Sequence, residues 1–180
     1  MFSTKFTLNL ITTLVVVCTL ASCSDKTALA TKTDTSAVAK SQKLKSPSIA
    51  LDVYKSPNCG CCKKWLSHIN DNGFESTVYS NDDFSVIKNE KGIAPRYRSC
   101  HTAISSNGYV FEGHVPAKFI QQFMQATQAV DVIGLSVPAM PVGSPGMEVD
   151  DKFQPYQILL LKSDGTSEVY AYVQSYKEQF

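Results

Sequence analysis

A strand pattern that leads into a cysteine-rich helix start constrains the fold more than any other part of the sequence. Residues 49–54 alternate in the two-residue period of a strand, and Ser56-Pro57-Asn58 interrupts it. The run Cys59-Gly60-Cys61-Cys62 then opens a segment whose apolar residues recur at helical spacing until Gly73. This junction predicts an α/β fold that holds thiols at a helix N-terminus.

The rest of the chain continues the alternation of strands and helices. Asn107-Gly108 lies between two apolar runs and is a strong hairpin signal. Pro116 is suited to open a helix, and the residues after it give that helix one apolar face. We expect the order β-α-β-α-β-β-α, an α/β sandwich, with an added Gly/Pro loop and a C-terminal β-hairpin. After the first strand and helix, the expected segments are a strand at 75–79, a helix at 82–90, hairpin strands at 100–105 and 109–115, a helix from Pro116, a loop at 134–147, and hairpin strands at 156–161 and 166–173.

The N-terminus has the pattern of a targeting segment. Residues 1–22 combine Lys5 with an apolar run and predict a signal peptide. Leu20-Ala21-Ser22-Cys23 resembles the bacterial lipobox, in which the cysteine after the cleavage site is lipidated. Ser24 favours the outer membrane under the Gram-negative sorting rule. The alternative is ordinary cleavage that leaves Cys23 as a free thiol; Cys18 lies in the segment that would be removed in either case.

Composition separates a tether from a globular domain. Residues 23–48 hold the expected lipidated cysteine and a stretch with few large apolar side chains, which predicts a disordered tether. Residues 49–180 form the expected domain, and 43% hydrophobic residues in the whole chain suffice for a packed core. A formal net charge of +1 argues against a nucleic-acid partner, since binding to phosphate backbones needs many cations.

The spacing of the cysteines favours a cluster of soft metal ions. A helix N-terminus favours the thiolate of Cys59, and Cys61 and Cys62 share its first turn. Side chains at adjacent helical positions point about 100° apart, so one closed tetrahedral zinc site fits poorly. Thiolates that bridge several ions fit this run, and Cu(I) suits sulfur ligands. Two alternatives remain open: a catalytic dithiol of Cys59 and Cys62, in a thiol–disulfide or copper-redox oxidoreductase, and a pair of structural disulfides.

Two resemblances to known protein families bear on the choice between these alternatives. Cys59-Gly60-Cys61-Cys62 followed by Lys63 resembles the thioredoxin redox motif, with Cys61 in place of the usual proline. Cys100 stands where thioredoxins place a cis-proline against their cysteines. Four separated blocks, spanning about Leu51 to Met147, resemble the CopG-type copper-resistance proteins, a CxCC family with a thioredoxin-like fold. The blocks are Ser56-Pro57-Asn58-Cys59-Gly60-Cys61-Cys62, Arg98-Ser99-Cys100-His101-Thr102-Ala103, Glu112-Gly113-His114-Val115-Pro116 and the run from Val137 to Glu148.

The CopG resemblance implies a set of copper ligands beyond the three clustered cysteines. It adds Cys100, His101 and His114, and more weakly the thioethers of Met140 and Met147. Without it, His101 would be read as a hydrogen-bonded core histidine, and the two methionines as fillers of irregular gaps. Strand alternation would aim Cys100 and His101 at opposite faces, so both reach one site only where the strand begins irregularly.

Other candidate side chains are assigned to the core or the surface. We expect Trp65 and Met124 to lie in the core and His68 on the solvated face of the first helix. No Ser-His-Asp set, paired carboxylates or glycine-rich phosphate loop stands out.

The function predicted from the sequence is copper handling or resistance outside the cytoplasm. The expected protein is lipid-anchored on the periplasmic side and holds more than one Cu(I) ion in a thiolate-bridged site. Its expected partners are copper ions, the membrane, and a protein that donates or accepts copper. The alternative is the thiol–disulfide or copper-redox oxidoreductase that uses Cys59 and Cys62.

Overall fold

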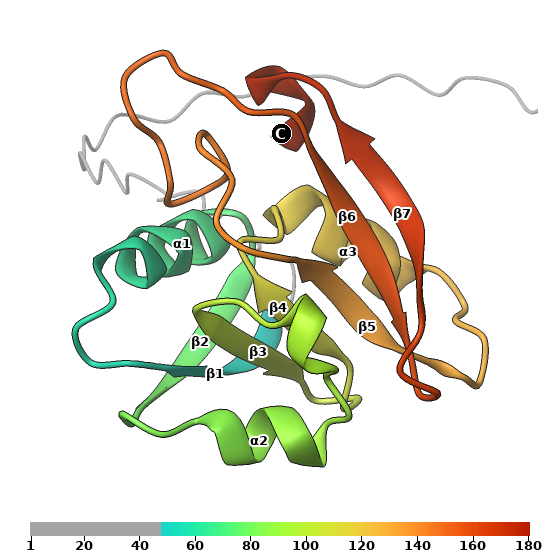
Figure 1. The fold of residues 1–180 in the computed structure, drawn as a ribbon. Helices are drawn as coiled ribbons and strands as arrows, with labels where there is room; N and C mark the ends of the chain where they lie inside the picture. The colour runs from blue at the N-terminus through green and yellow to red at the C-terminus, as the bar shows by residue number, and fades with distance from the viewer. Residues whose placement is uncertain (1–47) are drawn as a thin grey trace, which may run out of the picture. The chain divides into compact units, whose positions relative to one another are not determined.

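The computed structural model describes residues 48–180 (Figure 1). The predicted signal peptide, the predicted lipidation site Cys23 and all of the predicted tether except Ser48 lie outside these residues. Within the described range, no helix combines the length and hydrophobicity needed to cross a bilayer. The strands are β1 (Ile49–Lys55), β2 (Phe74–Ser80), β3 (His101–Ser105), β4 (Val110–Gly113), β5 (Val132–Val137), β6 (Tyr156–Lys162) and β7 (Ser167–Val173); the helices are α1 (Gly60–Asp71), α2 (Ser85–Glu90) and α3 (Ala117–Gln125), with 3-10 turns η1 (Pro95–Tyr97) and η2 (Tyr176–Gln179).

One mixed sheet of seven strands organises the domain, in the order β2-β1-β3-β4-β5-β6-β7. β1 pairs with β2 in parallel and β4 with β5 in parallel, and the other neighbours are antiparallel. The predicted α/β class is confirmed. The C-terminal hairpin β6–β7 continues this sheet through β5 and shares its core.

The strand β5 corrects the sequence-based expectation of a Gly/Pro loop over residues 134–147. Residues 134–137 belong to this strand, which lies between β4 and β6, and the loop begins only after Val137. Gly134 has φ +151°, and a Cβ at this position would overlap the backbone of Val110 on β4. The glycine is therefore a close-approach position inside a central strand.

The two faces of the sheet carry different apolar cores. Figure 1 shows α1 and α2 on opposite sides of β1 and β3. Residues directly opposite on antiparallel strands share a face, so Val53 of β1 and Ala103 of β3 point the same way. They join α1 and α3 in the larger apolar cluster, which contains Trp65, Ile69 and Phe123. The smaller cluster on the opposite face packs beside α2 and consists of Ile93, Ile104, Val110 and Leu161.

Candidate metal centre

The first turn of α1 places three cysteines at the end of β1. The Cys59 side chain caps the helix, because its Sγ accepts the backbone N–H of Cys62 at 3.2 Å. Cys59 and Cys62 are joined by a disulfide, which is the cysteine pair of the predicted redox alternative. Cys61 is a free thiol whose Sγ lies 3.4 Å from that of Cys59. In this oxidised state, two of the three sulfurs are bonded to each other.

Cys100 brings a fourth sulfur to the same place. It directly precedes β3, which pairs with β1, and its backbone oxygen lies 3.7 Å from the Sγ of Cys62. The Sγ atoms of Cys59, Cys61, Cys62 and Cys100 all lie within 4.8 Å of one another. Residues 38 or more positions apart in the chain are thereby gathered at one helix start.

Two buried imidazoles extend the sulfur cluster through Cys100. The Cys100 Sγ lies 3.3 Å from Nδ1 of His101 and 3.0 Å from Nε2 of His114. Both histidines have no exposed surface, and their rings meet edge-on with centroids 5.2 Å apart. Cys100 and His101 thus reach the same site, because Cys100 lies just outside the regular strand.

Hydrogen bonding fixes which nitrogen of His114 is available to a metal. Its Nδ1 lies 2.7 Å from the carbonyl oxygen of Pro145. A carbonyl can only accept, so Nδ1 carries the proton and Nε2 presents its lone pair toward the Cys100 sulfur. In His101, Nδ1 faces the same sulfur, and Nε2 has no hydrogen-bond partner among residues 48–180.

Burial keeps Cys100 and the two histidines uncharged. It raises the pKa of the Cys100 thiol to about 12, and the nearby Cys61 adds to this effect. Burial also holds the pKa of His101 well below its usual range, with a further contribution from His114. The pKa of His114 is lowered as well, again mainly by burial. Near neutral pH, the site therefore offers a neutral Cys100 thiol and two neutral imidazoles.

A buried ion pair supports the segment that carries Cys100 from the α2 side of the sheet. Lys88 of α2 contacts the carboxylate of Glu112 on β4, and both side chains are almost fully buried. Glu112 also accepts the Thr102 hydroxyl at 2.6 Å and the backbone N–H of Ser99 at 2.6 Å. Burial raises the pKa of Glu112 and lowers that of Lys88, while the contact between opposite charges opposes both shifts. The pair fixes the residue just before Cys100.

The two methionines occupy different surroundings in the loop after β5. The side chain of Met140 is 47% exposed and lines a hollow of about 450 Å³ beside β6. Met147 is half-buried and follows Gly146, which packs on the first turn of α1 against Cys61. Of the two, Met147 belongs to the segment in contact with the cysteine helix. The ligand role of either thioether stays a prediction.

His68 differs from its predicted position on the solvated face. It is half-buried, and its Nε2 accepts the backbone N–H of Ala117 at 3.1 Å, which satisfies a free donor at the start of α3. Burial lowers its pKa. Trp65 is fully buried, as expected, and its ring contacts that of His101 in a tilted arrangement, with centroids 4.2 Å apart and planes at 46°.

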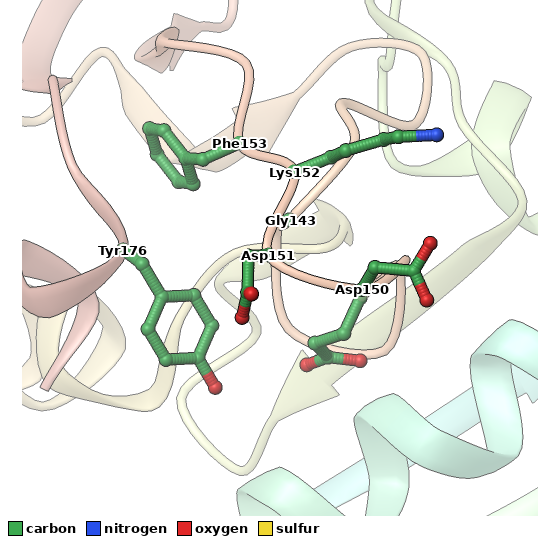
Figure 2. A pocket seen from close by; sticks show the side chains of 7 residues that line it. Gly143, Asp150, Asp151, Lys152, Phe153 and Tyr176 are labelled. Atoms are coloured by element: carbon green, nitrogen blue, oxygen red, sulfur yellow. The ribbon is translucent and has the colours of Figure 1, made fainter.

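A cavity of about 320 Å³ opens elsewhere on the loop and is shown in Figure 2. Its lining is acidic and aromatic, with none of the cysteines or histidines of the cluster. The lining residues are Gly143, Glu148, Asp150, Asp151, Lys152, Phe153 and Tyr176. Within the described range, only the cysteine–histidine cluster brings together three or more cysteine, histidine or acidic side chains in reach of one ion.

Four residues that contribute to the site were not predicted from the sequence. The Pro145 carbonyl orients His114, but a backbone acceptor leaves no trace in side-chain patterns. Glu112 and Lys88 look like ordinary charged residues, although the position of Glu112 inside an otherwise apolar strand could have marked it. Lys55 continues the inward-facing series of β1 and is buried beside the site.

Comparison with known proteins supplies the family. The family described as "Protein of unknown function, DUF411" matches residues 97–147, which include Cys100, His101 and His114. A search of curated proteins gives no match. A solved structure named copper resistance protein CopG, form 2, shares 40% identity with a TM-score of 0.64, over 70% of this chain and 98% of that one. Form 1 shares 41% identity with the same TM-score, over 71% and 98% of the two chains. With this identity over nearly the whole length of the solved relatives, the chain belongs to the CopG family of copper resistance proteins.

Proposed function

We propose that this protein handles copper outside the cytoplasm by binding more than one Cu(I) ion at the cysteine–histidine cluster. The ligands would be the thiolates of Cys59, Cys61, Cys62 and Cys100, with His101 and His114 completing the set. The observation that carries the proposal is that the sulfurs of Cys59, Cys61 and Cys62 converge with that of Cys100, which itself lies within 3.3 Å of both imidazoles. The names of the solved relatives support copper as the metal.

The chemistry of the donors fits Cu(I). Thiolate sulfur and neutral imidazole nitrogen are soft and borderline ligands, and the hard carboxylates of the nearby loop are not part of the cluster. His114 is held in the tautomer that leaves Nε2 free. Cys62 is buried beside Trp65, whereas Cys59, Cys61 and Cys100 are half-buried, so a metal ion can reach the sulfurs and displace their protons on binding.

The redox state of the Cys59–Cys62 pair determines how many sulfurs can bind copper. While Cys59 and Cys62 are bonded to each other, their sulfurs cannot act as thiolate ligands. The reduced protein therefore offers four cysteine sulfurs, and the oxidised protein offers those of Cys61 and Cys100 alone among the described cysteines. We expect copper stoichiometry to follow the redox state of this pair.

Metal analysis of the reduced protein tests the proposal. The full chain with Cys18→Ser and Cys23→Ser keeps only the four site cysteines, so the copper count reports on the cluster. It should bind more than one Cu(I), resist competition from Zn²⁺, and bind less after oxidation. Cys61→Pro should lower the stoichiometry with the fold intact, because proline is tolerated in the first turn of a helix. One-to-one zinc binding without Cu(I) binding would contradict the proposal.

A second function is favoured by the disulfide itself. Cys59 and Cys62 could oxidise a substrate dithiol: one substrate thiolate attacks a sulfur of the disulfide, the other sulfur leaves as a thiolate, and the second substrate thiolate releases the pair. The substrate loses two electrons and the cysteine pair gains them.

An insulin-reduction assay separates the two functions. A thiol–disulfide oxidoreductase needs Cys59 and Cys62 in this assay but tolerates loss of Cys61. For a copper-binding protein, loading with copper should abolish exchange, and Cys100→Pro should weaken copper binding while raising exchange.

The proposed function also includes a cellular location for the protein. We infer that the chain is exported and lipid-anchored at Cys23, on the periplasmic side of the outer membrane, where a partner protein would supply or accept copper. The lipobox-like sequence before Cys23 supports this. In cells, Cys23→Ser should release the protein from the membrane fraction or leave an unprocessed precursor. Unchanged processing and membrane association of this variant would contradict a lipid anchor.

A further inference from the structure

Lys55 is a buried ammonium group with no acidic partner. It ends β1, its residue is only 3% exposed, and its Nζ donates to the backbone oxygen of Ser56 at 2.8 Å. Among residues 48–180, the ion pairs involve Lys88 and Lys162 and do not include Lys55. A buried charge without a counter-charge lowers the stability of a fold, so its presence calls for a reason.

The register of the sheet places Lys55 beside the metal centre. Lys55 is directly opposite His101 in the antiparallel pair β1–β3, and residues opposite each other project from the same face. This is the face covered by α1, because Leu51 and Val53 precede Lys55 in the same alternation and pack in the cluster that contains Trp65. The His101 ring in turn contacts the Cys100 sulfur at 3.3 Å.

The second buried lysine, Lys88, differs from Lys55 in the face of the sheet on which it lies and in the balance of its charge. Lys88 lies on the α2 side, where it contacts Thr102, the neighbour of His101 on the opposite face of β3. Its charge is already balanced by Glu112. Lys55 thus provides a buried positive charge without an acidic partner among residues 48–180, on the face of the sheet that carries the cluster.

We propose that the ammonium group of Lys55 balances the negative charge of the copper-loaded thiolate cluster. The inference rests on the proposed function. Four thiolates carry four negative charges, so any cluster with fewer than four Cu(I) ions is an anion. A fixed ammonium group nearby stabilises this anion, because the site is partly buried and the interaction is screened less than it would be at the surface. The contribution is greatest for the first ions bound and declines as the number of copper ions approaches the number of thiolates.

Lys55→Met and Lys55→Arg separate charge from packing. Both are made in the reduced full chain with Cys18→Ser and Cys23→Ser, and a chelator competition measures the affinity for the first Cu(I). Lys55→Met should weaken this affinity about tenfold, which is the interaction of two unit charges at an assumed separation of about 12 Å and an effective dielectric constant of about 20. Lys55→Arg keeps the charge and should retain most of the affinity. Lys63→Met, which removes an exposed charge next to Cys62, should change it less than about twofold because solvent screens that charge.

Stability of the copper-free protein gives the second measurement. In urea unfolding, Lys55→Met should be as stable as the parent or more stable, because it removes an unpaired buried charge. Affinity and stability therefore change in opposite directions, which a purely structural role would not produce. If Lys55→Met fails to fold, Lys55→Gln replaces it in both assays.

The outcomes of these experiments separate the role of Lys55 from copper binding itself. Equal first-ion affinity in the parent and the neutral variants overturns the role of Lys55 and leaves copper binding untouched. Weakened affinity together with a destabilised apo protein, not restored by Lys55→Arg, also overturns it, since the side chain would then act through packing. Failure of the parent itself to bind Cu(I) overturns the proposed function, and the role of Lys55 with it, before any Lys55 variant is compared.

Discussion

Gly146→Ala tests the contact between the loop after β5 and the first turn of α1. Gly146 has φ +90°, and a Cβ there would lie 2.6 Å from the backbone oxygen of Cys61 and 2.8 Å from the backbone nitrogen of Trp65. The left-handed backbone costs an alanine about 1–2 kcal/mol. The steric overlap adds about 1–3 kcal/mol, because both contacts are with helix backbone that cannot rotate away. We expect the free energy of unfolding to fall by about 2–5 kcal/mol.

Gly165→Ala is the matched control for this substitution. Gly165 has φ +81° at the β6–β7 turn, and a Cβ there would meet no atom within 4 Å, so this variant carries the backbone cost alone. Urea unfolding of the apo protein, followed by the fluorescence of the single buried tryptophan, Trp65, gives both values. The Gly146 variant should lose at least about 1 kcal/mol more than the control. Equal losses would refute the claim that the loop is packed on the cysteine helix.

Three further predictions concern buried polar groups. Glu112→Gln should cost about 3–5 kcal/mol of unfolding free energy, because it leaves Lys88 charged and unpaired, whereas Lys88→Met with Glu112→Leu should cost less; denaturant titrations of both decide this. Burial lowers the pKa of His68, so the folded state binds its proton less readily, and stability should fall as the pH drops below about 6.5; His68→Gln should flatten this dependence, and equal slopes would contradict it. Since burial raises the pKa of Cys100 to about 12, copper binding near pH 7 should release its proton into a weakly buffered indicator solution, and Cys100→Ala should release fewer protons per copper ion.

Local patterns predicted the elements that carry the metal centre. The alternation before Ser56 and the helical spacing after Cys59 are properties of neighbouring residues, and β1 and α1 follow them. The strand β5 was missed because it is almost entirely buried on both faces of the sheet and shows no polar alternation. Gly134 also looked like a loop residue, although its role depends on Val110, a residue on a different strand.

The candidate ligands could be predicted from the sequence because their chemistry lies in their own side chains. The contacts that orient them could not. The proximity of Cys100 to the helix start followed from a resemblance, and the β1–β3 pairing now explains it. The tautomer of His114 depends on a carbonyl 31 residues away, and no pattern in the sequence encodes that contact. The structure also places His68 against the backbone of α3, a tertiary contact that the amphipathic pattern of α1 could not reveal.

The candidate metal ligands come from the start of α1, from Cys100 and His101 at the start of β3, and from His114 just after β4, and the Pro145 carbonyl accepts a hydrogen bond from His114. An ion bound by all of them would connect distant parts of the chain in the manner of a cross-link. A ligand that binds only the folded state adds about 4 kcal/mol of stability when its concentration is a thousand times the dissociation constant. Proteases cleave mainly opened chains, so the loaded protein would be degraded more slowly than the empty one. The amount of this protein in a cell would then rise with the copper supply even at a constant rate of synthesis.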